Sequence, residues 1–250
     1  MTEKFESFFV FDIAPEVISS LLVMGIIFVL AIIVAIQAAF QNPLKKPKGL
    51  LLIAEIGVNF FDGLVEGLMG PRFKGFGGYI MAISVYLFIA FIFGLCGLPS
   101  PVTNLAVPLS LSLCTFVLIH AVSVKYTKWG YFKRYIDPIP VFLPINLISM
   151  WAPLLSLTLR LFGNAIAGWA LMSILYNALQ GLSSTIFSSL PDGWNQLIFA
   201  PIVTPILHAY FDLFSGFIQT TVFIFLTMCF MNNEVPDDVD DIPLQTKGGK

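Results

Sequence analysis

Residues 140–180 read PVFLPINLISMWAPLLSLTLRLFGNAIAGWALMSILYNALQ, and residues 195–231 read NQLIFAPIVTPILHAYFDLFSGFIQTTVFIFLTMCFM. As helices, these two apolar runs would extend roughly 60 Å and 55 Å, at 1.5 Å per residue. The hydrocarbon core of a bilayer is only about 30 Å thick, and an ordinary tilt of about 20° does not absorb the excess. We therefore predict a hairpin of two long, steeply tilted membrane helices in preference to helices broken at Pro153, Pro201 and Pro205.

The rest of the chain has the same apolar character. Of its 250 residues, 57% are hydrophobic and only 11% are charged, whereas a soluble protein carries about 25% charged residues. Such a chain cannot cover its own surface with polar groups, so the sequence predicts an all-α integral membrane protein. Three further runs approach the roughly 20 residues that a membrane span needs, which brings the expected number of spans to about five. They are residues 17–36, 79–98 and 105–124.

Residues 50–70 predict a helix of a different kind. Glu55, Asp62 and Glu66 are spaced seven and four residues apart and share one helical face, which favours an interfacial amphipathic helix over a span. We expect residues 1–231 to form a single transmembrane domain. The acidic tail, residues 232–250, lacks hydrophobic periodicity and is expected to be disordered.

Positive charge gathers in two loop regions, which predict the sidedness of the chain. Loops rich in Lys and Arg face the cytoplasm. The linkers at residues 97–104 and 181–194 contain neither residue and are expected outside, so the N-terminus is expected outside and the C-terminal tail in the cytoplasm. The basic residues are Lys45, Lys46, Lys48, Arg72 and Lys74 in one region, and Lys125, Lys128, Lys133 and Arg134 in the other.

Several classes of protein are disfavoured by what the sequence lacks. It has no phosphate-cradling glycine loop, no HExxH motif and no GxSxG motif, so we do not expect the chain to be catalytic by itself. No basic aromatic face predicts nucleic-acid binding, and we expect no cofactor. Cys96, Cys114 and Cys229 all lie in apolar runs and are expected to act as small hydrophobic residues, with no metal site. The first run lacks a basic leader and a cleavage site, so we interpret it as a retained span.

Arg160 is the first candidate functional residue. A charge in the middle of a membrane costs about 2.5–3.5 kcal/mol on insertion scales, and such a residue is a functional hypothesis by default. The alternative is an arginine that pairs structurally with an acid or a carbonyl. Ser156 and Asn164 lie four residues before and after it and complete one polar stripe.

A second polar stripe runs along the last apolar segment. Its members step by four, four, three and four residues, so all of them lie on one face. Two facing stripes in apolar helices predict a lined aqueous path. Each of three members also has a purely structural interpretation. His208 could be a core histidine, Asp212 could be a structural partner of Arg160 or His208, and Gln219 could form a hydrogen bond between helices. The stripe consists of Thr204, His208, Asp212, Ser215 and Gln219. His120, in another run, is expected to be an interfacial or core histidine.

Four motifs resemble one known family. The stretch LSLTLRLFGNAIAG at residues 155–168 closely resembles the motif around the essential arginine of subunit a of the F-type ATP synthases. The stretch FSGFIQTTVFIFLTMCFM at residues 214–231 resembles that family's last helix. Two shorter matches, TNLAVPLSLSL at residues 103–113 and PINLIS at residues 144–149, occur in the same order, so the resemblance covers nearly the whole chain.

The resemblance implies an ion-translocating stator subunit of a rotary ATP synthase. Arg160 would face a ring of subunit c, whose carboxylates carry ions between two offset half-channels, and would keep the half-channels apart. Asn164 and Gln219 would help to position it. The implied partners are the c-ring, the peripheral-stalk subunit b, other ATP synthase subunits and membrane lipid. The implied location is a bacterial plasma (inner) membrane.

The chain departs from the family pattern at several positions. Nine residues after the arginine, where many relatives have an acid or histidine, it has Trp169. Seven residues before the glutamine, where relatives often have His or Glu, it has Asp212. Ser149 and Met150 stand where relatives often have acids. The outer half-channel would therefore depend on Asp212 with His208, and the inner one on Ser149, backbone and water.

Two other classes of protein remain as alternatives. A secondary transporter or channel could use a buried Arg–Asp site, although such folds often carry internal repeats. A transporter would purify alone, whereas a stator subunit would co-purify with a ring protein and an ATPase head. A membrane scaffold without conduction would not explain an arginine opposite a stripe of Asp and Gln.

Overall fold

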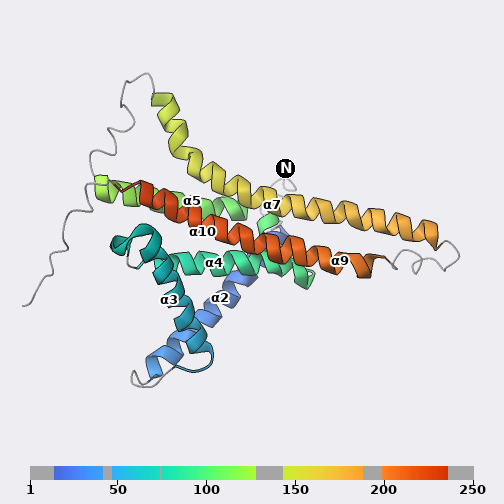
Figure 1. Ribbon diagram of the computed structural model, residues 1–250, viewed down its shortest axis with the longest axis horizontal. Helices are drawn as coiled ribbons and strands as arrows, with labels where there is room; N and C mark the ends of the chain where they lie inside the picture. The colour runs from blue at the N-terminus through green and yellow to red at the C-terminus, as the bar shows by residue number, and fades with distance from the viewer. Residues whose placement is uncertain (1–13, 42–46, 74, 128–142, 188–198, 236–250) are drawn as a thin grey trace, which may run out of the picture.

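The computed structural model describes residues 14–41, 47–73, 75–127, 143–187 and 199–235. Its elements are helices, of which η1, η2 and η3 are 3-10 turns and η5 is a π-helix (Figure 1). In chain order they are α2 (Pro15–Phe40), α3 (Leu50–Met69), η1 (Pro71–Phe73), α4 (Gly77–Ile92), η2 (Phe93–Cys96), η3 (Pro101–Thr103), α5 (Ala106–Thr127), α7 (Leu143–Ile186), α9 (Ala200–His208), η5 (Ala209–Phe214) and α10 (Ser215–Asn233).

Within the described ranges, five helical stretches are long and apolar enough to cross a membrane. They are Pro15–Phe40, Gly77–Cys96, Ala106–Thr127, Ile148–Ile186 and Ala200–Asn233. The predicted all-α membrane fold with about five spans is thereby confirmed. The helix expected at residues 50–70 forms as α3, and it is not one of the five. Its location at the membrane surface stays a prediction.

Some predictions fall wholly or partly outside the described residues. They concern the tail after Val235 and several of the loop cations. The division into one transmembrane domain and a tail also stays a prediction. The loop cations in question are Lys45, Lys46, Lys74, Lys128, Lys133 and Arg134.

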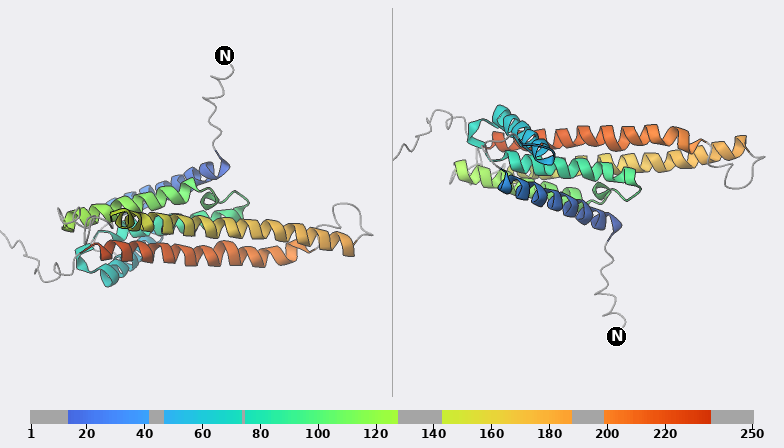
Figure 2. Two further views of the ribbon diagram at one scale, coloured as in Figure 1. Left: turned by 90° about the horizontal axis from the view of Figure 1, so that it is seen from above. Right: turned by 90° about the horizontal axis from the view of Figure 1, so that it is seen from below.

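The long hairpin is the main feature of the fold. α7 runs antiparallel to the α9–η5–α10 segment, and the two lie side by side in both views of Figure 2. α7 has 44 residues with Pro153 inside it, and Figure 1 shows its first part bent away from the rest. A proline removes one backbone hydrogen bond and bends a helix in this way. The tilt of the hairpin against a bilayer stays a prediction.

The bounds of the two long segments differ from those expected. α7 continues to Ile186 instead of ending near residue 180, because a single glycine such as Gly181 costs a helix only about 1 kcal/mol. The last segment begins as α9 at Ala200, and Pro201 occupies its first turn, where a proline is tolerated. Pro205 lies inside α9 and does not end it. The segment then continues through the π-helical turn η5 into α10.

The remaining helices pack on one side of the hairpin. α4 lies against α10, α3 and α2, while α5 packs on α7 (Figures 1 and 2). The buried apolar cluster joins these helices. By contrast, large apolar side chains on α2 such as Phe28 and Val29 are 67% and 56% exposed. An exposed apolar surface of this extent is stable against lipid and not against water. The largest fully buried apolar side chains include Phe73, Ile80, Leu87, Leu157, Leu161, Phe223 and Met228.

Two hydroxyl pairs cross-link the smaller helices. The Ser20 Oγ lies 2.7 Å from the Tyr86 hydroxyl, which joins α2 to α4. The Tyr79 hydroxyl lies 2.9 Å from Thr115 Oγ1, which joins α4 to α5. Hydrogen bonds of this kind satisfy polar groups that lipid cannot solvate, and they add modestly to helix association in membranes.

A glycine sets the distance between α4 and α10. A Cβ atom at Gly216 would lie 2.6 Å from the Cβ of Phe91, far inside van der Waals contact. We expect Gly216→Ala to force these helices apart and to lower stability by about 1–3 kcal/mol, the usual cost of overpacking. The thermal unfolding midpoint of the protein in detergent micelles measures this.

Gly25→Ala on α2 provides the matched control, because no atom lies within 4 Å of a Cβ at that position. Its midpoint should stay the same or rise, since alanine favours a helix over glycine. A Gly216→Ala midpoint as high as that of Gly25→Ala would contradict the packing argument.

Candidate functional site

Arg160 lies on an exposed face of α7. Its neighbours Leu155 and Leu159 are 53% and 60% exposed, so the guanidinium emerges from an apolar surface. Among the described residues, no carboxylate lies within salt-bridge distance of it, and it has no hydrogen-bond partner. A charge placed in hydrocarbon is costly unless it is paired. The described part of the chain does not supply that pairing.

The first cavity has a volume of about 910 Å³ and opens between the hairpin and the loop that follows α4. α7 contributes Asn164, Trp169 and Tyr176 to its wall, and the α9–η5 segment contributes His208 and Asp212. The opposite wall comes from the start of α2, the end of α4 and the η2–η3 region. The polar residues of this opposite wall are Glu16, Ser100 and Thr103.

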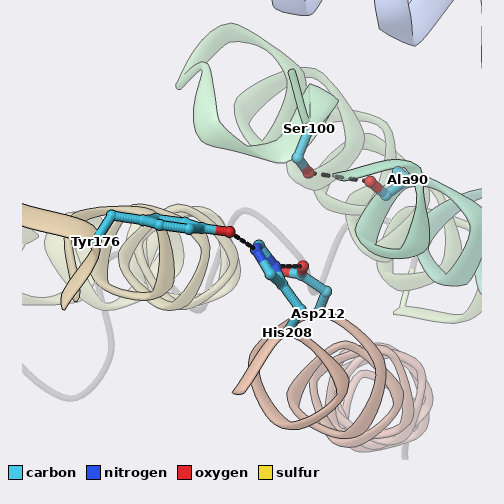
Figure 3. Close-up of polar contacts among 5 residues, drawn as sticks. All are labelled: Ala90, Ser100, Tyr176, His208 and Asp212. Carbon is cyan, nitrogen blue, oxygen red and sulfur yellow. Dashed lines mark hydrogen bonds and ion pairs between the residues drawn. The ribbon is translucent and has the colours of Figure 1, made fainter. Parts of the chain in front are cut away.

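A chain of three polar side chains crosses this cavity (Figure 3). His208 Nδ1 lies 2.6 Å from Asp212 Oδ2, and the Tyr176 hydroxyl lies 3.0 Å from His208 Nε2. Tyr176 reaches across from α7, whereas His208 and Asp212 stand one helical turn apart on the facing segment. Asp212 thus pairs with His208 and not with Arg160. His208 ends α9 and Asp212 lies in the π-helical turn, a form often found at functional sites.

The wall facing Asp212 is held by local hydrogen bonds. Ser100 Oγ donates to the carbonyl of Ala90 at 3.0 Å (Figure 3). Thr103 Oγ1 donates to the carbonyl of Ser100 at 2.7 Å. A Cβ atom at Gly94 would lie 3.9 Å from the Asp212 carboxylate. The turn η2 that follows α4 therefore packs within ordinary van der Waals reach of the carboxylate.

The two predicted polar stripes meet on the Arg160 side of the Tyr176–His208–Asp212 hydrogen bonds. Asn164 Nδ2 donates to Gln219 Oε1 at 3.4 Å, and Ser215 Oγ donates to Asn164 Oδ1 at 3.0 Å. Gln219 is only 6% exposed, and its Nε2 has no partner among the described residues. Neither amide is bonded to Arg160. The stripes thus join α7 to α10 directly, one helical turn from the arginine.

The second cavity, of about 520 Å³, lies at the other end of the hairpin. It is lined by the first part of α7, the later part of α5 and the end of α10. Ser149 lines it, as does His120, whose Nδ1 lies 3.0 Å from the carbonyl of Phe116. The sequence led us to expect a core or interfacial histidine at position 120, and in the structure this half-buried histidine also lines the cavity. The remaining polar lining is Asn146, Ser156, Asn233 and Glu234.

The two cavities stop on either side of Arg160. The second uses α7 as far as Ser156, and the first uses α7 from Asn164 onward, so each ends four residues from the arginine. Between them, Leu157 and Leu161 are 1% and 0% exposed within the buried apolar cluster. An apolar plug therefore separates two polar cavities that open toward opposite ends of the helical bundle.

Some of these cavity residues were predicted from the sequence, and others were not. Asn164, His208, Asp212 and Ser149 line the cavities, and Gln219 bonds Asn164 beside them. Tyr176 was missed, although it lies twelve residues after Asn164 on the same ridge of i, i+4 positions. No sequence pattern pointed to Glu16, His120 or Glu234 as cavity residues. They reach the cavities from α2, from α5 and from the end of α10.

These features define a multi-pass membrane protein with two separated polar cavities and an arginine between them. Comparison with known proteins identifies the family: the sequence profile of the ATP synthase A chain matches residues 17–232. ATP synthase subunit a of Staphylococcus saprophyticus is 31% identical over 88% of this chain and 91% of its own length. That of Mycoplasma genitalium is 29% identical over 91% and 85%. A third relative, from Propionigenium modestum, is named as sodium ion specific and is 29% identical over 91% and 76%.

The chain belongs to the ATP synthase A chain family. It is a multi-pass membrane protein of a bacterial type and a member of an ATP synthase complex.

The cavities predict opposite labelling of two engineered cysteines. Thr103→Cys lines the first cavity and Ser149→Cys lines the second. In a background without Cys96, Cys114 and Cys229, a charged thiol reagent should label Thr103→Cys from one side of the membrane and Ser149→Cys from the other. Labelling rates in right-side-out and inverted vesicles measure this.

Leu157→Cys, in the plug, should react from neither side, because its side chain is 1% exposed. Equal labelling of both cavity cysteines from a single side would show that the cavities open together.

Proposed function

We propose that this chain is the ion-translocating stator subunit of a rotary F-type ATP synthase, with its two cavities as half-channels and Arg160 as the barrier between them. The observation that carries this proposal is the location of Arg160. It is exposed on an apolar face, lacks a counter-charge among the described residues, and lies one helical turn from each cavity. A ring of subunit c, with carboxylates on its outer helices, would supply the missing charge.

The ion path follows from the chemistry of the two cavities. An ion from outside enters the first cavity, where Asp212 and His208 attract it and pass it to a ring carboxylate. The neutralised carboxylate can then move into lipid at low cost. After the ring has turned, the carboxylate reaches the second cavity and releases its ion. There Ser149 and water form the exit, and His120 and Glu234 add groups that can bind a proton.

Arg160 enforces the direction of this exchange. A guanidinium stays charged at any relevant pH. It favours the ionised form of a carboxylate that approaches, and so promotes release of the bound ion. The same charge repels a free cation at the point where the cavities come closest. Because Leu157 and Leu161 seal the interior, ions can cross only on the ring.

The proposed orientation places the first cavity outside and the second at the cytoplasm of a bacterial plasma (inner) membrane. Lys125 supports this, because it lies in the last turn of α5, beyond the residues that line the second cavity. The N-terminus is then outside and the C-terminal tail cytoplasmic. Partners are the c-ring, the peripheral-stalk subunit b and membrane lipid. The subunit itself is not catalytic. The ring's own carboxylate site selects H⁺ or Na⁺, and the proposal holds for either ion.

We expect Arg160→Ala to lower the rate of ATP-driven ion pumping in inverted membrane vesicles by tenfold or more, while the ATPase head stays bound. Without the charge, the ring carboxylate is no longer driven to release its ion, and the barrier between the cavities is lost. The expected loss of pumping rate corresponds to about the strength of one charged pair in a site without water. Pumping is measured with a fluorescent ion indicator, and retention of the head by ATP hydrolysis on washed vesicles. Leu159→Ala, on the same exposed face, serves as the control and should pump normally.

Pumping by Arg160→Ala at the wild-type rate would make the arginine structural and overturn the barrier mechanism. Absence of any ATPase from vesicles with the wild-type chain would overturn the stator assignment.

Asp212→Asn should slow ion transport steeply, by about tenfold or more at low driving force, because the first cavity then loses the carboxylate bonded to His208. The measurement is the pumping rate at several transmembrane potentials. Glu55→Gln, which removes an exposed acid of α3 outside both cavities, is the matched control. Unchanged transport by Asp212→Asn across a pH series would refute a role for this carboxylate.

A further inference from the structure

Tyr176 is the one member of the hydrogen-bonded chain in the first cavity that comes from α7. Its hydroxyl lies 3.0 Å from His208 Nε2, on the side of the imidazole opposite to Asp212 (Figure 3). The two rings lie with centroids 6.1 Å apart and planes at 48°, so they are not stacked. The contact between α7 and α9 at this point is therefore a directed polar one.

The hydrogen bond between His208 and Asp212 relates the proton on Nδ1 to the state of the carboxylate. A carboxylate in its ionised form only accepts hydrogen bonds, so with that form of Asp212 the Nδ1 atom, 2.6 Å away, is the donor. In a neutral imidazole, Nε2 is then the acceptor, and the Tyr176 hydroxyl donates to it. When the imidazole is protonated, Nε2 becomes a donor and the same hydroxyl oxygen accepts.

A hydroxyl group suits both states because it can donate and accept with little change of geometry. The imidazole can therefore gain and lose a proton without leaving its bond to Asp212. A phenylalanine at this position would leave Nε2 without a protein partner, and water in the cavity would compete for the ring. Second partners of this kind commonly fix the tautomer and orientation of a working histidine.

We propose that Tyr176 is a positioning residue for His208, holding the imidazole against Asp212 through both of its protonation states. This inference rests on the proposed function, because it assumes that protons or water-borne cations use the first cavity. Tyr176 forms no covalent bond and carries no ion itself. It acts only through His208.

The other titratable and charged groups near this histidine define what else could shape the pH dependence. Among the described residues that line the cavity, Asp212 on the same segment and Tyr176 on α7 bond His208 directly. Glu16 contributes the other carboxylate, from the first turn of α2. The walls from α4 and η2–η3 add Ser100 and Thr103, which are polar but not charged.

The test is ATP-driven pumping in inverted vesicles that contain the whole ATP synthase, measured across a pH series. Tyr176→Phe removes only the hydroxyl, and we expect a roughly tenfold slower rate, as for loss of one hydrogen bond to a group that becomes charged. The size of the loss should change with pH. In a His208→Ala background, Tyr176→Phe should cause no further loss, because the two residues act as a unit.

Tyr79→Phe is the matched control, since it also removes a tyrosine hydroxyl that bonds another helix, here Thr115 on α5, away from both cavities. It should pump at the wild-type rate at every pH. Tyr176→Gln retains a donor and an acceptor and should pump faster than Tyr176→Phe. Binding of the ATPase head is checked for each variant.

Three results would overturn the proposal: a Tyr176→Phe rate equal to wild type at every pH, an equal loss with and without His208, or equal rates for Tyr176→Gln and Tyr176→Phe. Arg160→Ala vesicles measured in parallel separate this outcome from failure of the stator assignment. If Arg160→Ala does not pump and Tyr176→Phe is normal, only the role of Tyr176 is wrong.

Discussion

The structure depends on the charge of Arg160, which the described part of the chain leaves unpaired. A guanidinium cannot lose its proton to escape the cost of hydrocarbon, so it needs an external partner or water. Arg160 lies on an exposed apolar face of α7, with no carboxylate of the described residues beside it. Each of the two cavities ends one helical turn away from it. In the proposed function, the exposed side of this arginine faces the ring of subunit c, which supplies the partner charge.

The length of the hairpin follows from the same constraint. α7 forms part of the wall of both cavities, from Asn146 in the second to Tyr176 in the first. That stretch would extend roughly 45 Å as a helix, more than the hydrocarbon thickness that an ordinary span of about 20 residues covers. A single continuous helix fixes the relative positions of both cavities and the arginine. The antiparallel α9–η5–α10 segment completes both walls and brings Gln219 against Asn164.

The sequence predicted features that depend on local pattern, and it missed those that depend on helix packing. Apolar runs predicted the five spans, and steps of three and four residues predicted the stripes that carry Asn164, His208 and Asp212. The end of α7 was placed about six residues too early, because Gly181 was taken as its end although a single glycine costs a helix little. An aqueous path along the hairpin was predicted, but the share of α2 and α5 in the cavity walls, through Glu16 and His120, was not, because it depends on how the helices pack. Whether Asp212 pairs with Arg160 or with His208 was also open from the sequence; in the structure its carboxylate lies 2.6 Å from His208 Nδ1.

The first cavity draws its negative charge from elements other than α7. The family resemblance led us to expect an acid or histidine at position 169, where this chain has Trp169, yet the same cavity holds carboxylates from Asp212 and Glu16. Neither acid is on α7. What an ion requires is water, a nearby negative charge and a path that ends beside the ring, and any helix that reaches the cavity can supply the charge. The arginine has fewer possible positions, because its charge must lie between the two cavities, and among the described elements only the two long segments of the hairpin line both of them.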